Sequence, residues 1–406
     1  MWMNTAITGI NAASSDLTTI SNNIANSSTV GFKQSRTEFA DMYAWAGYGM
    51  SGNVVGNGVY VQNVAQQFTQ GSLNSTGNVL DLAISGDGFF TVNDGGKMMY
   101  TRAGSFGTDA GGYIVNSMGQ RLQVYPPVQG SASFNTGTLS DVQLSSATNP
   151  PRATTKTTVD VNLPSDAEPP ANAAFDPTDP ESFNETTSMT VYDSLGAPHT
   201  QSTYYVKDAT SNSWTVHVTM DGTEVGTGTQ ITFDESGKLV TPADGQLAIS
   251  GYDPGNGAAV MNMTMDVSEV SQYGEDFTVS SLSQDGYTAG QIWGIEVTQD
   301  GVIQARYTNG QLTPLGQIAM ATFPNTQGLQ QLGSTSWAET SDSGQPLMGT
   351  GNNGNFGSVQ SGYLEASNVD LTQQLVSMMT AQRDFQANSQ VISTSDELMQ
   401  TIINLR

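Results

Sequence analysis

Apolar and small residues recur every third or fourth position along the end of the chain. This heptad-like spacing, uninterrupted by proline or glycine after Gly362, predicts one long helix over residues 367–406. Ser367 followed by Asp370 resembles a capping box, which would satisfy free N–H groups where the helix begins. The apolar seam of this helix is expected to consist of Leu371, Leu375, Met378, Phe385, Ile392, Met399 and Ile403.

The start of the chain repeats the same spacing and predicts a second helix. It should end near Asn26, because Asn-Ser-Ser-Thr-Val-Gly is typical of a turn. Burying each large apolar side chain stabilises by roughly 1.5–3 kcal/mol, whereas ordering each residue costs about 1–2 kcal/mol. We therefore expect this helix to be marginal alone and its order to depend on assembly. Its seam consists of Met3, Ile7, Ile10, Leu17 and Ile24.

Two interpretations of the terminal helices follow from this periodicity. They could form a helical hairpin that closes an ordinary domain. Alternatively, they pair as a coiled coil and then pack against other copies of the chain, which the energetic comparison favours.

Between the helices the pattern is alternating, with Asp-Gly and Asn-Gly turns, and predicts mainly antiparallel sheets. Residues 38–46 fit a short helix. Strands are expected at 80–84, 89–92, 97–101, 113–115 and 121–125, then at 158–163, 188–192, 202–206, 214–220, 231–233 and 260–267, and finally at 291–297, 302–307 and 317–323. The final set should complete the sheet that begins near Leu80.

The predicted fold class is therefore α+β and multidomain, with paired coiled-coil helices around nested, mainly antiparallel β domains. The expected division is a helical domain (1–29 and 363–406), a linking segment (30–71), a discontinuous β domain (72–150 and 286–362) and an inserted acidic outer β domain (151–285). The long loop 166–185, with four prolines, is expected to be exposed or functional.

The charge composition of the chain disfavours several classes of partner. Only 12% of the 406 residues are charged, and the net charge is −25 with 12 Lys and Arg. This balance argues against partners such as nucleic acid or an anionic membrane surface. Residues 152–285 hold 20 acidic and 4 basic residues, a net charge of −16, which favours a solvated outward position. No apolar run approaches the roughly 20 residues that cross a bilayer.

The sequence motifs that could indicate catalysis or ligand binding are weak. The chain has no cysteine, and no ordinary signal peptide is expected at its start. Two G-x-G-x-x-G matches, at Gly47-Gly49-Gly52 and Gly349-Gly351-Gly354, lack the strand-before, helix-after context of a dinucleotide site. His199 and His217 are expected on strand surfaces or near turns. We therefore predict no enzyme activity, catalytic residue, cofactor or metal.

Three stretches carry a family resemblance. Residues 22–33 read Asn-Asn-Ile-Ala-Asn-Ser-Ser-Thr-Val-Gly-Phe-Lys, residues 81–90 read Asp-Leu-Ala-Ile-Ser-Gly-Asp-Gly-Phe-Phe, and Ser-Asn-Val-Asp-Leu precedes Ala-Gln-Arg-Asp-Phe-Gln-Ala-Asn-Ser near the end. They resemble the signatures of bacterial flagellar rod and hook axial proteins, although Gln374 stands where an acidic residue is expected. The motif positions are Asn22, Asn23, Asn26, Thr29, Gly31, Phe32, Lys33, Gln382, Arg383 and Asn388.

The resemblance implies a self-assembling structural subunit, and the long acidic insertion fits a hook rather than a rod. It implies a flexible tube that acts as a universal joint between rod and filament. The implied partners are other copies, the rod, the hook cap, the hook–filament junction proteins and the type III export apparatus. The implied location is outside the cell, reached without a cleavable signal peptide. A distal rod subunit, a secreted glycan-binding β protein and a coiled-coil adhesin remain alternatives.

Overall fold

The computed structural model describes residues 2–42, 56–128, 131, 133–144 and 148–404. The chain forms two compact units. The first unit comprises Met1–Ser145, Gly294–Ala305 and Leu312–Arg406, and the second comprises Ser146–Trp293 and Arg306–Gln311. The four-part division expected from the sequence stays a prediction.

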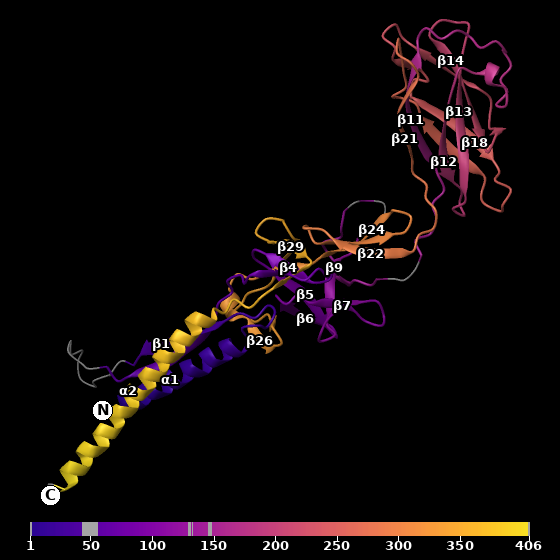
Figure 1. Ribbon diagram of the computed structural model, residues 1–406. Helices are drawn as coiled ribbons and strands as arrows, with labels where there is room; N and C mark the ends of the chain where they lie inside the picture. Colours follow the sequence, from indigo (N-terminus) through magenta and orange to yellow (C-terminus); the bar gives the residue numbers. More distant parts are fainter. Residues whose placement is uncertain (1, 43–55, 129–130, 132, 145–147, 405–406) are drawn as a thin grey trace. The chain divides into compact units, whose positions relative to one another are not determined.

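Two helices, α1 (Trp2–Ala25) and α2 (Leu371–Asn404), lie side by side in the first unit (Figure 1). They are antiparallel, because Gly9 lies against Asn388 near one end and Asn23 contacts Gln374 near the other. A Cβ at Gly9 would lie 2.7 Å from Oδ1 of Asn388, so glycine allows the helices their close approach. Neither helix is long and apolar enough to cross a membrane over its described residues.

The helix ends follow from local hydrogen bonds. At the end of α1, the Asn26 side chain donates to the carbonyl of Asn22 at 2.9 Å, as the turn sequence predicts. At the start of α2, Oδ1 of Asp370 accepts from the N–H groups of Thr372 and Gln373 at 2.8 and 3.1 Å. Asp370 is therefore the N-cap, and the capping box expected from Ser367 is wrong, because the helix begins at Leu371.

The short helix expected at 38–46 is also wrong over its described part. Residues Ser35–Asp41 form strand β1, which pairs antiparallel with β2 (Val59–Gln66); positions 43–46 lie outside the described residues. The local composition suits a helix, but the ladder to β2 and the burial of Thr37 against α1 favour the extended form.

The first unit contains a large sheet in which strands from the earlier and the later part of the chain lie side by side (Figure 1). Strand β9 pairs with β24, and β5 pairs with β25, so late strands do complete a sheet begun by early ones. The strand expected nearest Leu80 is not part of it, because that strand, β4, pairs with β29 in a separate sheet. Along its main path the sheet runs β22 (Ile292–Val297), β23 (Val302–Tyr307), β24 (Leu312–Ile318), β9 (Arg121–Tyr125), β5 (Phe89–Asp94), β6 (Lys97–Thr101), β27 (Ser336–Ala338) and β26 (Gln330–Gly333).

Shorter strands flank this path. They are β7 (Phe106–Thr108), β8 (Ile114–Asn116), β10 (Ser140–Asp141), β25 (Met320–Thr322) and β28 (Leu347–Gly349), with the separate pairs β3 (Leu73–Ser75) with β30 (Tyr363–Glu365) and β4 (Leu82–Ser85) with β29 (Ser358–Ser361). The single strand expected at 317–323 is in fact two, β24 and β25. The chain changes partner at Ala319, whose N–H donates to Gln123 and whose carbonyl accepts from Thr91.

The second unit packs two sheets over one apolar core. One sheet contains β12 (Glu185–Tyr192), β13 (Pro198–Lys207), β14 (Ser213–Met220), β15 (Thr223–Glu224), β16 (Thr229–Phe233) and β17 (Leu239–Thr241). The other contains β18 (Gln246–Tyr252), β19 (Met261–Asp266), β11 (Lys156–Pro164), β20 (Ser271–Tyr273) and β21 (Thr278–Gln284). Strand β11 alternates buried and half-buried residues, and its buried face joins Trp214 in the core.

The predicted α+β, multidomain class and mainly antiparallel pairing are confirmed. Parallel pairing occurs between β11 and β19 and between β11 and β20. The long loop 166–185 contains the short 3-10 helix η1 (Pro180–Ser182), and Phe175 stacks on His217 with ring centroids 4.1 Å apart. Another 3-10 helix, η2 (Thr326–Gly328), lies in the first unit.

Trp214, in the core of the second unit, gives a stability test, with the exposed Trp293 as its control. Trp214 is fully buried and its Nε1 donates to Gln272, whereas Trp293 is 71% exposed. Trp214→Ala is expected to destabilise this unit by about 3–5 kcal/mol, because it leaves a cavity and an unpaired amide. Trp293→Ala should change stability by less than about 0.5 kcal/mol. Amide hydrogen exchange of β11 and β14 measures both; equal effects would contradict this core assignment.

Candidate functional site

The apolar helix residues predicted as a seam are largely exposed in the single chain. Ile10, Leu17, Ile24, Met378 and Ile392 are half-buried. The exposed members are Met3, Ile7, Leu371, Leu375, Phe385, Met399 and Ile403, with exposed fractions from 37% to 67%. The helix residues that are buried are instead mainly small, namely Ala6, Ala12, Ala13, Ile20, Asn23, Ala381 and Ser395. The chain alone therefore leaves an apolar surface along both helices uncovered.

Part of α2 has no α1 residue beside it. The contacts of Gly9 with Asn388 and of Asn23 with Gln374 place the start of α1 near Ser395. Residues 396–404 therefore extend beyond α1 by about 13 Å at 1.5 Å per residue, as Figure 1 shows. Leu398, Met399 and Ile403 are exposed on this extension.

Asn23, in the motif at the end of α1, connects α1 with β1 and with α2. Its side chain is buried, donates to the carbonyl of Ser35 at 2.7 Å, and accepts from the Ser35 N–H at 2.9 Å. The same amide donates to Oε1 of Gln374 on α2 at 3.2 Å. Gln374, the departure from the expected acidic residue, also donates to Gln34 at 3.4 Å, which a carboxylate could not do.

The turn after α1 places the rest of the motif. Asn22 and Thr29 each hydrogen-bond with Asn26 within the turn. Gly31 has φ +69, and a Cβ there would lie 2.6 Å from the backbone nitrogen of Ala103. Its N–H donates to the carbonyl of Glu365 at 2.8 Å, and Phe32 beside it is buried. The turn thus fits closely against the sheet.

A buried ionic cluster lies beneath this turn, and we call Lys33, Arg102 and Glu365 the junction cluster. Lys33 Nζ is 2.6 Å from Oε1 of Glu365 and donates to the carbonyl of Thr69 at 2.8 Å. Arg102 Nη1 lies 3.5 Å from Oε2 of Glu365. The Lys33 and Glu365 side chains are fully buried, and burial lowers the pKa of both Lys33 and Arg102. The cluster connects the turn after α1 with the sheet and with the segment that leads into α2.

Sequence reasoning identified Lys33 but missed Arg102 and Glu365. The two members of the Lys33–Glu365 pair are 332 positions apart, and no local pattern distinguishes Glu365 from the other acidic residues. Asn368, also missed, accepts from the N–H of Gln34 and donates to the carbonyls of Gln67 and Thr69. The usable signal was its place in the Ser-Asn-Val-Asp-Leu motif.

The motif residues on α2 are not brought together. Asn388 lies against Gly9, whereas Gln382 and Arg383 are exposed. Arg383 forms no ion pair among the described residues. The structure gives Asn388 a packing role within the chain and leaves Gln382 and Arg383 facing solvent.

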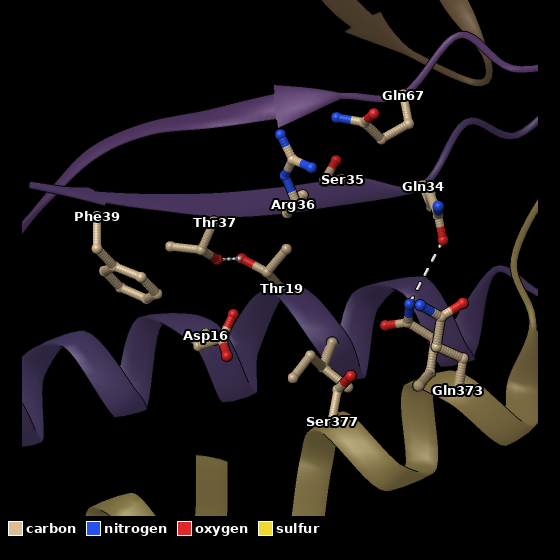
Figure 2. A pocket seen from close by; sticks show the side chains of 12 residues that line it. Asp16, Thr19, Gln34, Ser35, Arg36, Thr37, Phe39, Gln67, Gln373 and Ser377 are labelled. Carbon is tan, nitrogen blue, oxygen red and sulfur yellow. Dashed lines mark hydrogen bonds between the residues drawn. The ribbon is translucent and has the colours of Figure 1, made fainter. Parts of the chain in front are cut away.

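A cavity of about 340 Å³ opens between β1, α1 and α2 (Figure 2). Asp16 lines it, and the hydroxyls of Thr19 and Thr37 meet beside it at 3.0 Å. Burial raises the pKa of Asp16, the Thr37 hydrogen bond opposes this, and the nearby charge of Asp384 on α2 raises it further. The remaining lining is mostly amide and hydroxyl side chains, which suits a polar contact rather than a small apolar ligand.

The residues weighed as candidate chemistry have structural roles. His199 lies between the carboxylates of Asp221 and Asp193, at 2.7 and 3.4 Å. It follows the turn at 193–197, as one of the two expectations had it, and its side chain is buried rather than on a strand surface. No group of three or more potential metal ligands is present in the described parts of the chain. Gly349 ends β28, and Gly351 and Gly354 lie in the connection to β29. The match at Gly47-Gly49-Gly52 lies outside the described residues.

Family models match four stretches of the chain. The flagellar basal body rod protein model matches residues 3–33, and the flagellar hook protein FlgE/F/G D1 domain model matches 83–168. The flagellar basal body protein FlaE D2 domain model matches 162–287, and the flagellar basal body rod FlgEFG protein C-terminal model matches 360–405.

Full-length relatives agree. The flagellar hook protein FlgE of Escherichia coli is 36% identical, with 99% of each chain covered. The flagellar hook protein FlgE of Rhizobium meliloti is 33% identical over 100% of this chain and 98% of the relative. The crystal structure of Helicobacter pylori flagellar hook protein FlgE2 has a TM-score of 0.54 and 16% identity, and covers 72% of this chain and 100% of that one. That structure supports the fold alone.

The junction cluster gives a charge-specific stability test. Glu365→Gln is expected to destabilise the first unit by about 3–5 kcal/mol, because it leaves the charges of Lys33 and Arg102 buried without their acid. The matched control is Glu38→Gln, which breaks the exposed Arg36–Glu38 pair and should cost less than about 1 kcal/mol.

Amide exchange in β5 and β9 measures both variants. Adding Lys33→Met to Glu365→Gln should recover part of the loss, because one unpaired charge is removed. Equal losses for Glu365→Gln and Glu38→Gln would rule out a special contribution from the cluster.

Proposed function

The chain belongs to the flagellar hook protein family, and from that premise we propose that its copies stack into the hook tube through the exposed apolar residues of α1 and α2. Its role is that of a structural subunit of the hook, outside the cell, and the family is one of structural proteins rather than enzymes. The observation that carries the proposal is the seam of large apolar side chains that the single chain leaves uncovered.

The seam supplies the driving force for assembly. Full burial of a large apolar side chain stabilises by roughly 1.5–3 kcal/mol, so covering Leu375 or Ile403, which are 52% and 67% exposed, contributes about 1–2 kcal/mol each. The surfaces of α1 and α2 differ, so contacts between them are heterologous, and heterologous contacts that do not close into a ring generate open helical polymers. We infer that α1 and α2 of neighbouring copies pack as coiled coils and form the inner tube.

The four expected domains receive roles on this basis. Residues 1–29 and 363–406 form the inner tube, and 30–71 link it to the β domain of 72–150 and 286–362. The acidic domain of 151–285 lies outermost, where its net charge of −16 is solvated. The junction cluster makes the link to the sheet stiff, so torque on the helices reaches the β domains through it.

Bending follows from the contrast between these layers. The seam residues are apolar, and the chain has few charges to form directional ion pairs between neighbours. β domains can therefore exchange contacts at small cost while the seam persists, as a universal joint between rod and filament requires. The finer partners we propose are the rod, the hook cap, the hook–filament junction proteins and the type III export apparatus, with export that needs no cleavable signal peptide.

A distal rod subunit is the nearest alternative, because rod protein models match both ends of the chain. The D2 domain match over 162–287 and the full-length identity to hook proteins favour the hook. Electron microscopy of purified polymer distinguishes the two, since a hook is curved and a rod is straight.

The seam can be tested by single charges. Ile7→Asp or Leu375→Asp is expected to abolish tube formation, because each places a carboxylate where apolar side chains of neighbours meet. The control is Leu195→Asp in the second unit, where the apolar side chain is 60% exposed, against 42% for Ile7 and 52% for Leu375. Electron microscopy measures tubes, and circular dichroism confirms the β fold. Normal tubes from either seam variant would contradict the proposal.

The acidic domain can be removed at a point where its two ends meet. The N–H of Arg152 donates to the carbonyl of Tyr287 at 3.0 Å, so a short linker can replace residues 152–285. We expect the shortened chain still to polymerise, because the seam is intact, but into tubes of altered curvature or stiffness. A complete loss of polymerisation would show that this domain, rather than the helices, drives assembly.

A further inference from the structure

Asp16 is an acidic side chain without a cation. It is the only charged residue of α1, and it lines the cavity between β1, α1 and α2. Among the described residues its carboxylate takes part in no ion pair. Arg36 lines the same cavity, but its Nη2 donates to Glu38 at 2.8 Å. Asp384, the charged neighbour from α2, repels the carboxylate.

Arg383 is a cation without an acid. It is the only Lys or Arg of α2, it is exposed, and it forms no ion pair among the described residues. Consecutive helix residues point about 100° apart, so Asp384 faces Asp16 of the same chain while Arg383 points away. The charge on Arg383 is therefore directed away from α1 and into solvent in the single chain.

The surroundings of the two residues also match. Arg383 follows Met379 by four positions and Val376 by seven, so all three share one helix face, and the two apolar residues are 50% and 54% exposed. Asp16 shares its cavity with Phe39, which is 43% exposed (Figure 2). Each surface thus combines one charge with uncovered apolar area, and the charges are opposite.

We propose that the cavity beside Asp16 receives Arg383 of a second copy of this chain, with Met379 and Val376 of that copy packing near Phe39. The contact is heterologous, because a cavity on one copy receives a helix face of the next, as an open polymer requires. It rests on the proposed function and deepens it by assigning one charged pair that sets which surfaces meet. The ion pair orients copies that the apolar seam alone would join with little directional preference.

Charge reversal tests this pairing. Asp16→Lys and Arg383→Glu should each raise the critical concentration for polymerisation at least tenfold, and the combined swap should return it to within about threefold of the natural chain. Glu269→Lys, an exposed acid of the second unit, matches the charge change of Asp16→Lys and should have no effect. Sedimentation measures the critical concentration, and circular dichroism confirms folding.

The outcomes separate this proposal from the previous one. If the natural chain forms no tubes, the proposed function fails. If it forms tubes and the single reversals polymerise normally, or the swap is no better than the worse single variant, the Asp16–Arg383 pairing is overturned.

Cross-linking gives a second readout that does not depend on polymer yield. The chain has no cysteine, so Asp16→Cys and Arg383→Cys can be made in separate copies and mixed. A short bismaleimide should join the two copies only under polymerising conditions and only when both variants are present. The absence of a cross-link between copies within tubes would overturn the proposal.

The pairing also predicts a pH effect. Burial and Asp384 raise the pKa of Asp16 in the single chain, and an arginine beside it would lower that pKa in the polymer. Polymerisation then releases a proton, so the critical concentration should fall as pH rises through the pKa of Asp16 in the monomer. Asp16→Asn should remove this part of the dependence. An identical pH profile for the natural chain and Asp16→Asn would count against the pairing.

Discussion

The buried contact between Lys33 and Glu365 is the constraint on which the first unit depends. Both side chains are fully buried, and such charges are tolerated only when hydrogen bonds satisfy them. Oε1 of Glu365 also accepts from the N–H of Gly71, and the Glu365 carbonyl accepts from Gly31. Glu365 thus binds the turn after α1 and the segment that precedes β3, and it lies just before α2. These contacts hold the helices in a defined position against the sheet, rather than through a flexible linker.

The burial pattern of the two helices is the reverse of that usual in globular proteins. Small residues such as Ala12, Ala13 and Ala381 are buried, while large ones such as Leu375 and Met399 are exposed. Close approach at Gly9 pairs α1 with α2 and leaves the large side chains exposed in the single chain. The helices also carry little charge, since α1 holds Asp16 alone and α2 holds Arg383 and three acidic residues. Under the proposed function, neighbouring copies cover these exposed apolar side chains.

The second unit is organised differently. Its core brings together both sheets around Trp214, Val161 and Met265, and needs no other copy. Acidic residues cover it, and several are held by local hydrogen bonds, as when Asp285 accepts from the N–H groups of Thr155 and Lys156. Its ends meet at the bridge between Arg152 and Tyr287. A self-contained, charged domain inserted at one point can vary without disturbing the helices.

The sequence alone determined the features set by local pattern: the end of α1 at the Asn-rich turn, the strands Lys97–Thr101 and Arg121–Tyr125, and the family motifs. Only tertiary structure decided the rest. Residues Ser35–Asp41 became β1 because β2 offers a ladder, and one expected strand split at Ala319 because its partners differ. Arg102 and Glu365 could not be predicted as partners of Lys33, nor could the exposure of the seam. Burial and pairing depend on residues hundreds of positions apart, whose approach the local sequence does not encode.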